Sequence, residues 1–396
     1  MTAKSRAFAR FRRNRGAVLG LALVAALVLF ALLGPLFLPS PLTPDFDHGR
    51  GPFGTPSSPS LRHPFGTDTV FRDVLSRLAH GGRLSLEVAC LATFVSTVLG
   101  AAVGIGAGYF AGRRVRVDAI SDALALFALG VGGLLALRGG GVREGALLFA
   151  YAGFALSFGL RAFGGLRGLL DKRLPRPSGL LDLGLGVGLA LSFHHLGRAM
   201  GLALASVVVR AAFDRDQREE RHPSIDVDDG LMRLVDALLS FPFLLLAMAI
   251  AAAVDRTTEA SLFLLLGLTA WTGNARVVRS KTLQIRNLEF VVAAQALGAS
   301  TPMVLVRHVL PNVAGVLVVL GTSSVATMIV AEAALSFLGL SLPPPAPSWG
   351  SMLDEARPYF ALAPWLLAAP AIAILLTVLG FNLLGEGLRD AFDPKE

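Results

Sequence analysis

The sequence is poor in charged residues and has almost no cysteine. Of its 396 residues, 16% are charged, and Cys90 is the single cysteine. One cysteine excludes an intrachain disulfide. Because 54% of the residues are hydrophobic and the mean hydropathy is +0.63, the composition differs from that of an ordinary soluble domain.

Several catalytic motifs are missing as well. None of the four lysines follows a glycine, so there is no G-x-x-x-x-G-K-[ST] loop, and ATP hydrolysis by that route is excluded. The sequence has no H-E-x-x-H helix and no G-x-S-x-G elbow. The neighbours His194 and His195 would point about 100° apart on a helix, so they are not expected to share a metal. We predict that the chain is not an enzyme and has no metal or cofactor of its own.

Long apolar runs are what the sequence does contain. A helix needs ~20 residues to cross ~30 Å of hydrocarbon at 1.5 Å per residue. Runs of about this length predict an all-α, polytopic membrane helix bundle. The six expected spans are residues 17–38, 84–110, 231–254, 262–278, 313–340 and 361–384. In the second span, Gly100, Gly104 and Gly108 predict close helix crossing.

The basic residues indicate orientation in a lipid bilayer. Residues 1–16 hold six basic side chains and no acid, which predicts a cytoplasmic N-terminus. The net charge of +8 is explained in this way, without a nucleic-acid partner. The first apolar run is too long for a cleavable signal peptide, so we expect it to remain as a span.

A segment with many small and polar residues, 289–311, separates two of the spans. Its pattern predicts two short helices joined by a tight turn, with Gly298 in the positive-φ conformation after the first helix. Pro302 falls in the first turn of the second helix, where its missing N–H is harmless. Pro311 is expected to end that helix. The neighbouring basic residues place this segment in the cytoplasm.

The spacing of this segment resembles a known family signature. Ala293 and Ala294, then Gly298, then Leu310 and Pro311 look like the EAA loop of ABC-importer permeases. In that family the loop docks into a cleft of the ATPase subunit and transmits its closure to the membrane helices. The resemblance therefore implies that these five residues form an ATPase-docking site.

Other motifs support the same resemblance. HPFGTDTVFRDVLSR at 63–77 is similar to HPxGTDxxGRDVxSR of the dipeptide, oligopeptide and nickel permeases. Two positions depart from the family: Val292 replaces the glutamate of the EAA motif, and Phe71 replaces a glycine, which makes a tight turn there doubtful. We expect 63–77 to lie as an interfacial helix on the outer side. From 229 to 396 the motifs follow in the family's order, and the tail FNLLGEGLRDAFDPKE closely matches the family's C-terminus.

The resemblance implies a C-type transmembrane subunit of an importer in the prokaryotic inner membrane, with both termini cytoplasmic. Its solute would be a dipeptide, an oligopeptide or a similar small solute such as nickel. Its partners would be a second permease subunit, two ABC ATPase subunits that hydrolyse ATP, and an extracytoplasmic solute-binding protein. The alternative is a membrane enzyme or signalling protein that uses the same helix bundle.

Between 113 and 228 the resemblance stops. The chain is thus divided into residues 1–112 with two spans and an external loop, a hydrophobic insertion at 113–228, and a permease core at 229–396. Both ends of the insertion are expected in the cytoplasm, so its spans must be even in number. Four apolar runs lie near 119–137, 145–160, 179–196 and 199–213. We predict four extra spans; two spans and a membrane-lying hairpin are the alternative.

Glu332 lies inside the apolar run 313–340, where a carboxylate is costly unless it meets water or a partner. Two interpretations are open. Glu332 lines the translocation path, or it is a buried partner of a hydroxyl, arginine or backbone group at the interface with a second permease subunit.

Overall fold

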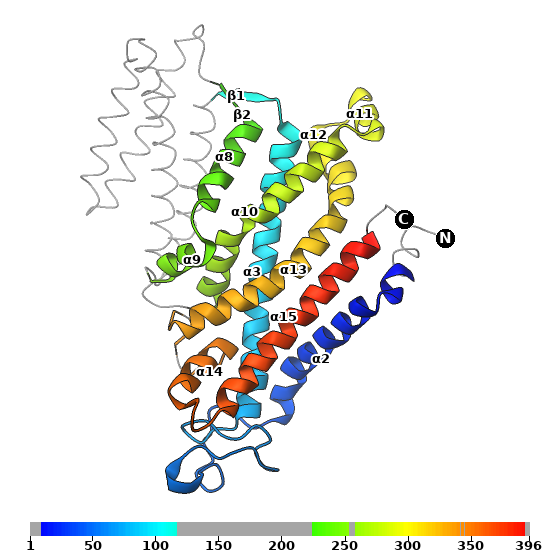
Figure 1. The fold of residues 1–396 in the computed structure, drawn as a ribbon. Coiled ribbons are helices and arrows are strands. Elements are labelled where there is room, and N and C mark those ends of the chain that lie inside the picture. Colours follow the sequence, from blue (N-terminus) through cyan, green and yellow to red (C-terminus); the bar gives the residue numbers. More distant parts are fainter. Residues whose placement is uncertain (1–8, 117–223, 253–257, 341, 344, 393–396) are drawn as a thin grey trace, which may run out of the picture. The chain divides into compact units, whose positions relative to one another are not determined.

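The structure is a computed structural model that describes residues 9–116, 224–252, 258–340, 342–343 and 345–392. The described part is a bundle of long helices, as predicted (Figure 1). Five helical segments in it are long and apolar enough to cross a membrane. The long helices are α2 (Arg15–Phe37), α3 (Val74–Phe110), α10 (Glu259–Arg286), α13 (Leu310–Phe337) and α15 (Trp365–Phe392).

The predicted span over 231–254 is instead a bent pair of helices. The segments α8 (Val227–Leu239) and α9 (Phe243–Ala252) meet at 77°, and they supply a sixth span only if the pair counts as one. Pro242 stands at the break. A proline has no N–H to donate, and it disfavours helical geometry in the residue before it, which explains why the helix stops there.

The expected interfacial helix over 63–77 is wrong. Residues 63–73 form turns and isolated bridges, and α3 begins at Val74. Asp73 caps α3, since its Oδ2 accepts a hydrogen bond of 2.7 Å from the Ser76 N–H. Gly66 and Phe71 have φ values of 73° and 65°, which no helix can contain. The turn at Phe71 is therefore kept although the glycine is absent.

Helices α3 and α10 cross closely at the predicted glycine stripe. A Cβ atom at Gly100 would lie 2.7 Å from the Cβ of Asn274, and one at Gly108 would lie 2.7 Å from the Cβ of Thr282. Such distances are shorter than van der Waals contact, so only glycine fits. Without a hydrophobic driving force between helices in lipid, close packing of this kind holds them together.

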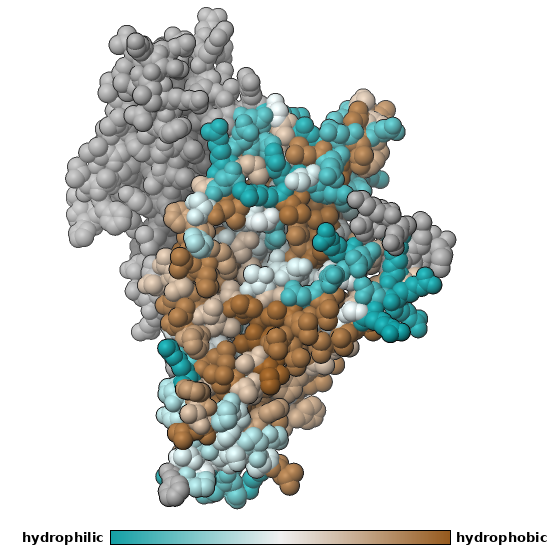
Figure 2. Space-filling view, viewed as in Figure 1, coloured by the Kyte–Doolittle hydropathy of each residue, from teal (hydrophilic) through white to brown (hydrophobic). Residues whose placement is uncertain are grey.

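Both described termini lie at one end of the bundle. Helices α2 and α15 lie side by side and antiparallel (Figure 1), and the Asn14 Nδ2–H donates to Asp390 Oδ2 over 3.0 Å. The start of α13 lies at this end too, because a Cβ atom built on Gly315 would lie 3.7 Å from the Phe392 ring. The opposite end carries the loop 39–73 and α14 (Trp349–Ala356). Figure 2 shows apolar surface over the middle of the visible face and hydrophilic side chains towards both ends, as expected for a membrane protein.

A second compact unit, Phe110–Gly230, contains the insertion. The strands β1 (Arg114–Arg116) and β2 (Ser224–Asp226) pair antiparallel, so the chain enters and leaves residues 117–223 at adjacent places. The Gly112 N–H also donates to Asp226 Oδ2 over 2.8 Å. The four spans expected within the insertion, and His194 and His195, lie outside the described residues.

Candidate functional site

The segment between α10 and α13 forms two short helices, α11 (Glu289–Ala296) and α12 (Thr301–Val304). We call residues 289–304 the knob. Gly298 has a φ of 84°, and the Ala299 N–H donates to the Ala294 carbonyl over 3.0 Å, so the helix ends as predicted. No atom lies within 4 Å of a Cβ built on Gly298. The turn needs glycine for its backbone conformation, and its surface is open.

Pro311 does not end the second helix, contrary to the sequence-based expectation. Helix α12 continues through a π-helical segment, η3 (Leu305–Val309), into α13, and Thr301–Phe337 is one helical segment of 37 residues. The Leu310 N–H donates to the Leu305 carbonyl, which is the i→i+5 bond of a π-helix. This wider turn makes room for the Pro311 ring, which would otherwise meet the preceding turn. The knob is thus joined to a membrane span without a break.

The knob exposes large apolar side chains. Leu297 is 89% exposed and Val292 is 51% exposed, and Val306 on η3, just after the knob, is 65% exposed. Contiguous exposed apolar side chains mark interaction sites in soluble regions. Sequence reasoning singled out the small residues and missed these. The sequence does contain a signal for them, because these apolar residues fall outside the buried face of the two short helices.

The residues predicted to dock an ATPase lie on the same part of the chain. Ala293 and Gly298 are exposed and Ala294 is half-buried, all on α11 or its final turn. Leu310 and Pro311 are exposed where the chain enters α13. The structure therefore leaves all five accessible at least in part.

The inner side of the knob is fixed to the bundle. Val291 and Val304 are fully buried. The Gln295 Nε2–H donates to Tyr109 Oη over 3.0 Å, and the Arg286 Nη1–H donates to the Gly108 carbonyl over 3.2 Å. Gln295 thus ties the knob to the last turn of α3, and Arg286, the last residue of α10, holds the same turn from just before the knob.

Glu332 lies inside this chain, near the α14 end of α13. Its side chain is 1% exposed and accepts hydrogen bonds from Ser85 Oγ (2.9 Å) and Ser336 Oγ (2.7 Å). Ser85 Oγ in turn accepts from the Trp349 N–H over 3.2 Å. Ser348, the N-cap of α14, donates to Ser336 Oγ over 3.3 Å. Glu332 thus joins α3, α13 and α14 of one subunit.

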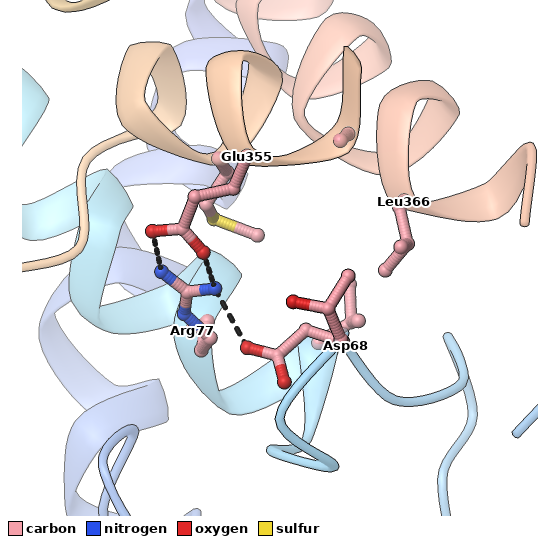
Figure 3. A pocket seen from close by; sticks show the side chains of 8 residues that line it. Asp68, Arg77, Glu355 and Leu366 are labelled. Carbon is pink, nitrogen blue, oxygen red and sulfur yellow. Dashed lines mark hydrogen bonds and ion pairs between the residues drawn. The ribbon is translucent and has the colours of Figure 1, made fainter. Parts of the chain in front are cut away.

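A cluster of two arginines and two carboxylates lies at the α14 end, and Figure 3 shows three of its members, Arg77, Asp68 and Glu355. Arg77 donates to both Glu355 oxygens, over 2.5 and 2.8 Å, and to Asp68 Oδ2 over 2.7 Å. Arg72 donates to the same Asp68 oxygen over 2.6 Å. We call these four residues the ionic cluster. The adjacent cavity, which Leu366 also lines, has a volume of about 10 Å³, enough for about one water molecule.

The loop before this cluster is held by further polar contacts. The His63 Nδ1 atom lies 3.0 Å from Asp73 Oδ1, and Trp365 Nε1 lies 3.5 Å from the Thr67 carbonyl oxygen. The His48 backbone N–H donates to Asp45 and lowers the pKa of that carboxyl below its ordinary value. These contacts order the loop against α3 and α15.

Two family models match the sequence. The model for binding-protein-dependent transport system inner membrane components matches residues 220–396, which hold the knob and Glu332. The model for the N-terminal TM domain of oligopeptide transport permease C matches residues 4–52, which hold α2. Together they cover more than half of the chain. The chain belongs to the ABC-importer permeases of the peptide and oligopeptide family.

Curated relatives agree with this assignment. The permease is 45% identical over 168 residues to the glutathione transport system permease protein GsiD of Shigella dysenteriae serotype 1, covering 42% of this chain and 55% of that protein. It is 44% identical over 168 residues to GsiD of Escherichia coli O6:K15:H31, with the same coverage. The matched part of the permease thus spans about half the length of these relatives. Residues 53–219 fall outside both family models, and they include Arg77 and most of the insertion at 113–228.

Proposed function

We propose that this permease is one of two transmembrane subunits of an ABC importer that moves peptides or similar small solutes inward across the cell membrane. The chain itself is not an enzyme in this proposal, and it holds no cofactor. Two separate ATPase subunits hydrolyse ATP, and an extracytoplasmic solute-binding protein delivers the solute. The names of the relatives, which are glutathione permeases, favour a peptide-like solute over nickel.

The knob is the observation that carries the proposal. It combines a fixed inner side with exposed apolar residues, at the end of the bundle where the basic N-terminal segment begins α2. Under the positive-inside rule this end is cytoplasmic, so both termini and the knob face the ATPases. Because Thr301–Phe337 is one helical segment, a displacement of the knob is carried along a span about 55 Å long at 1.5 Å per residue.

Reconstitution with candidate partners tests this function. The full chain would be co-expressed with a second permease and ABC ATPases, purified, and placed in proteoliposomes with the binding protein. We expect co-purification and ATP hydrolysis that rises when the solute-loaded binding protein is added. A cysteine at Ala294 in a Cys90→Ser background should cross-link to an ATPase. A chain that binds no ATPase under these conditions would not be an importer subunit.

We also propose that the insertion adds four spans between cytoplasmic ends. The antiparallel pairing of β1 with β2 supports this, because it brings the two ends of the segment together. In a Cys90→Ser background, cysteines replacing Gly140 and Gly197 should react with an impermeant thiol reagent added outside, and one replacing Lys172 should not. External labelling at position 172 would overturn this topology.

A further inference from the structure

A groove lies between α9, α13 and α15. Its volume is about 330 Å³, within the ~300–1,000 Å³ range of small-molecule sites. Phe243, Val330 and Val378 supply apolar walls, and alanines of α13 leave the space open. Two polar side chains, Thr327 and Asn382, also line the groove.

The two polar side chains lie at different depths in their apolar runs. Thr327 comes ten residues, or about 15 Å, before the end of α13, near the middle of the run 313–340. Asn382 lies near the C-terminal end of the run 361–384, four residues before Glu386. Both are exposed, and neither has a hydrogen-bond partner among the residues that the structure describes. The Thr327 hydroxyl, facing lipid at this depth, would lose its hydrogen bonds to water without replacement. Something other than lipid therefore covers this face.

The break between α8 and α9 points to the same place. Ser240, Phe241 and Pro242 interrupt the helix about 20 Å from the start of α8, and Phe241 is 61% exposed. Irregular backbone at membrane depth is tolerated only inside protein or beside a water-filled cavity. The first residue of α9, Phe243, lines the groove. The break and the unpartnered Thr327 hydroxyl thus both indicate that this face meets protein or water rather than lipid.

We propose that Thr327 and Asn382 line the solute path and form hydrogen bonds with the transported solute, an inference that rests on the proposed importer function. Both groups are neutral, and each donates and accepts hydrogen bonds. Peptide bonds carry the same donors and acceptors, and apolar walls suit the side chains of a peptide. The chemistry that fits is a small solute with amide groups, held weakly enough to pass on.

Cysteine accessibility tests whether the groove is hydrated. In the assembled importer with the Cys90→Ser change, Thr327→Cys and Asn382→Cys should each react with a small hydrophilic thiol reagent. The matched control is Leu29→Cys, which is 54% exposed on α2 near the middle of that helix and away from the groove. It should react at least tenfold more slowly. If neither groove position reacts in any nucleotide state, the groove is dry and the proposal is wrong.

Transport of radiolabelled tripeptides, glutathione and trialanine, tests the contact itself. Asn382→Leu keeps the size but removes the carboxamide, and we expect uptake to fall about tenfold, the loss typical of one hydrogen bond left unmade. Asn382→Gln should recover part of the uptake, and Leu29→Ala should leave it unchanged. Uptake by Asn382→Leu equal to that of the unaltered assembly would overturn the proposal. The thiol labelling does not require transport, so its result can be interpreted separately. An assembly that shows no ATP-driven uptake would contradict the importer function itself.

Discussion

At the α14 end of the bundle, charged side chains from three segments pair with one another inside the chain, whereas at the knob apolar side chains point away from it. Arg77 is 3% exposed and its two Nη groups pair with Asp68 and Glu355, while Leu297 is 89% exposed. The ion pairs of the cluster close within one subunit, whereas the exposed apolar side chains of the knob are not covered by the described part of the chain. Ion pairs that close within one chain indicate a role in folding, whereas exposed apolar side chains indicate a binding partner.

The two ends also differ in the residues that adopt a positive φ. Phe71, at the α14 end, has a φ of 65° and packs against the Phe46 ring with centroids 5.9 Å apart. At the knob, Gly298 has a φ of 84° and open space beside it. Neighbours hold the first residue in a conformation that costs a bulky side chain roughly 1–2 kcal/mol. The knob has no such neighbours, so glycine is required there.

The largest expected effect concerns coupling at the knob. Ala294→Glu places a charge on the face proposed to meet the ATPase, and an unpaired charge buried at an interface costs about 3–5 kcal/mol. Solute-stimulated ATPase activity in proteoliposomes should fall at least 100-fold, while the melting temperature of the isolated permease stays the same. Gly298→Asp should act alike, with added strain in the turn.

The control for this change is Gln284→Glu, which adds the same charge at an exposed position of α10 just before the knob. It should retain coupling. If solute-stimulated ATPase activity is normal in both Ala294→Glu and Gly298→Asp, the knob is not the docking site. The exposed apolar side chains of the knob would then not mark the ATPase contact.

Changes in the ionic cluster should lower the stability of the permease, unlike the changes in the knob. Arg77→Met removes the more buried of the two arginines that bridge Asp68 and Glu355 and leaves only Arg72 between them, and breaking a buried pair costs about 3 kcal/mol or more. We expect a lower melting temperature in detergent and less protein in the membrane. Arg276→Gln is the matched control, because the Arg276–Asp236 pair is more than half exposed on both sides and such pairs contribute about 0–1 kcal/mol. Equal melting temperatures for the two variants would show that the cluster does not hold this end together.

Sequence patterns predicted the parts of the molecule that depend on local order. Apolar runs located the five long helices, though the run at 231–254 forms a bent pair, and Gly298 located the turn. Both are set by residues close together in the sequence. The pairing of Arg77 with Glu355 joins residues 278 positions apart, and no local pattern contains it. The passage of the helix through Pro311 was missed because proline normally stops a helix, and the π-helical turn that accommodates it has no sequence signature known to us.

Glu332 is a smaller test of the same contrast. If it joins α3, α13 and α14 as the hydrogen bonds indicate, Glu332→Leu should lower the free energy of unfolding by about 2 kcal/mol, for two hydrogen bonds of about 1 kcal/mol each. Glu332→Gln keeps an acceptor and should cost less than about 1 kcal/mol. Thermal unfolding in detergent measures both. A Gln variant of unchanged stability that no longer transports would place Glu332 in the solute path instead.

The smallest expected effect is at Phe71, where two opposing terms nearly cancel. Phe71→Gly relieves roughly 1–2 kcal/mol of backbone strain. It also removes the edge-to-face contact with Phe46, worth about 0.5–1.5 kcal/mol, and adds the entropy cost of a glycine, about 0.5–1 kcal/mol. The net change in the free energy of unfolding should therefore lie within about 1 kcal/mol of zero. Phe46→Leu removes the same ring contact without relieving strain, so thermal unfolding should show it to be the more destabilising of the two. If Phe71→Gly is instead clearly the worse variant, the strain relieved at Phe71 is smaller than the entropy cost of the glycine together with the other contacts of the Phe71 side chain, such as that of Arg50 over its ring.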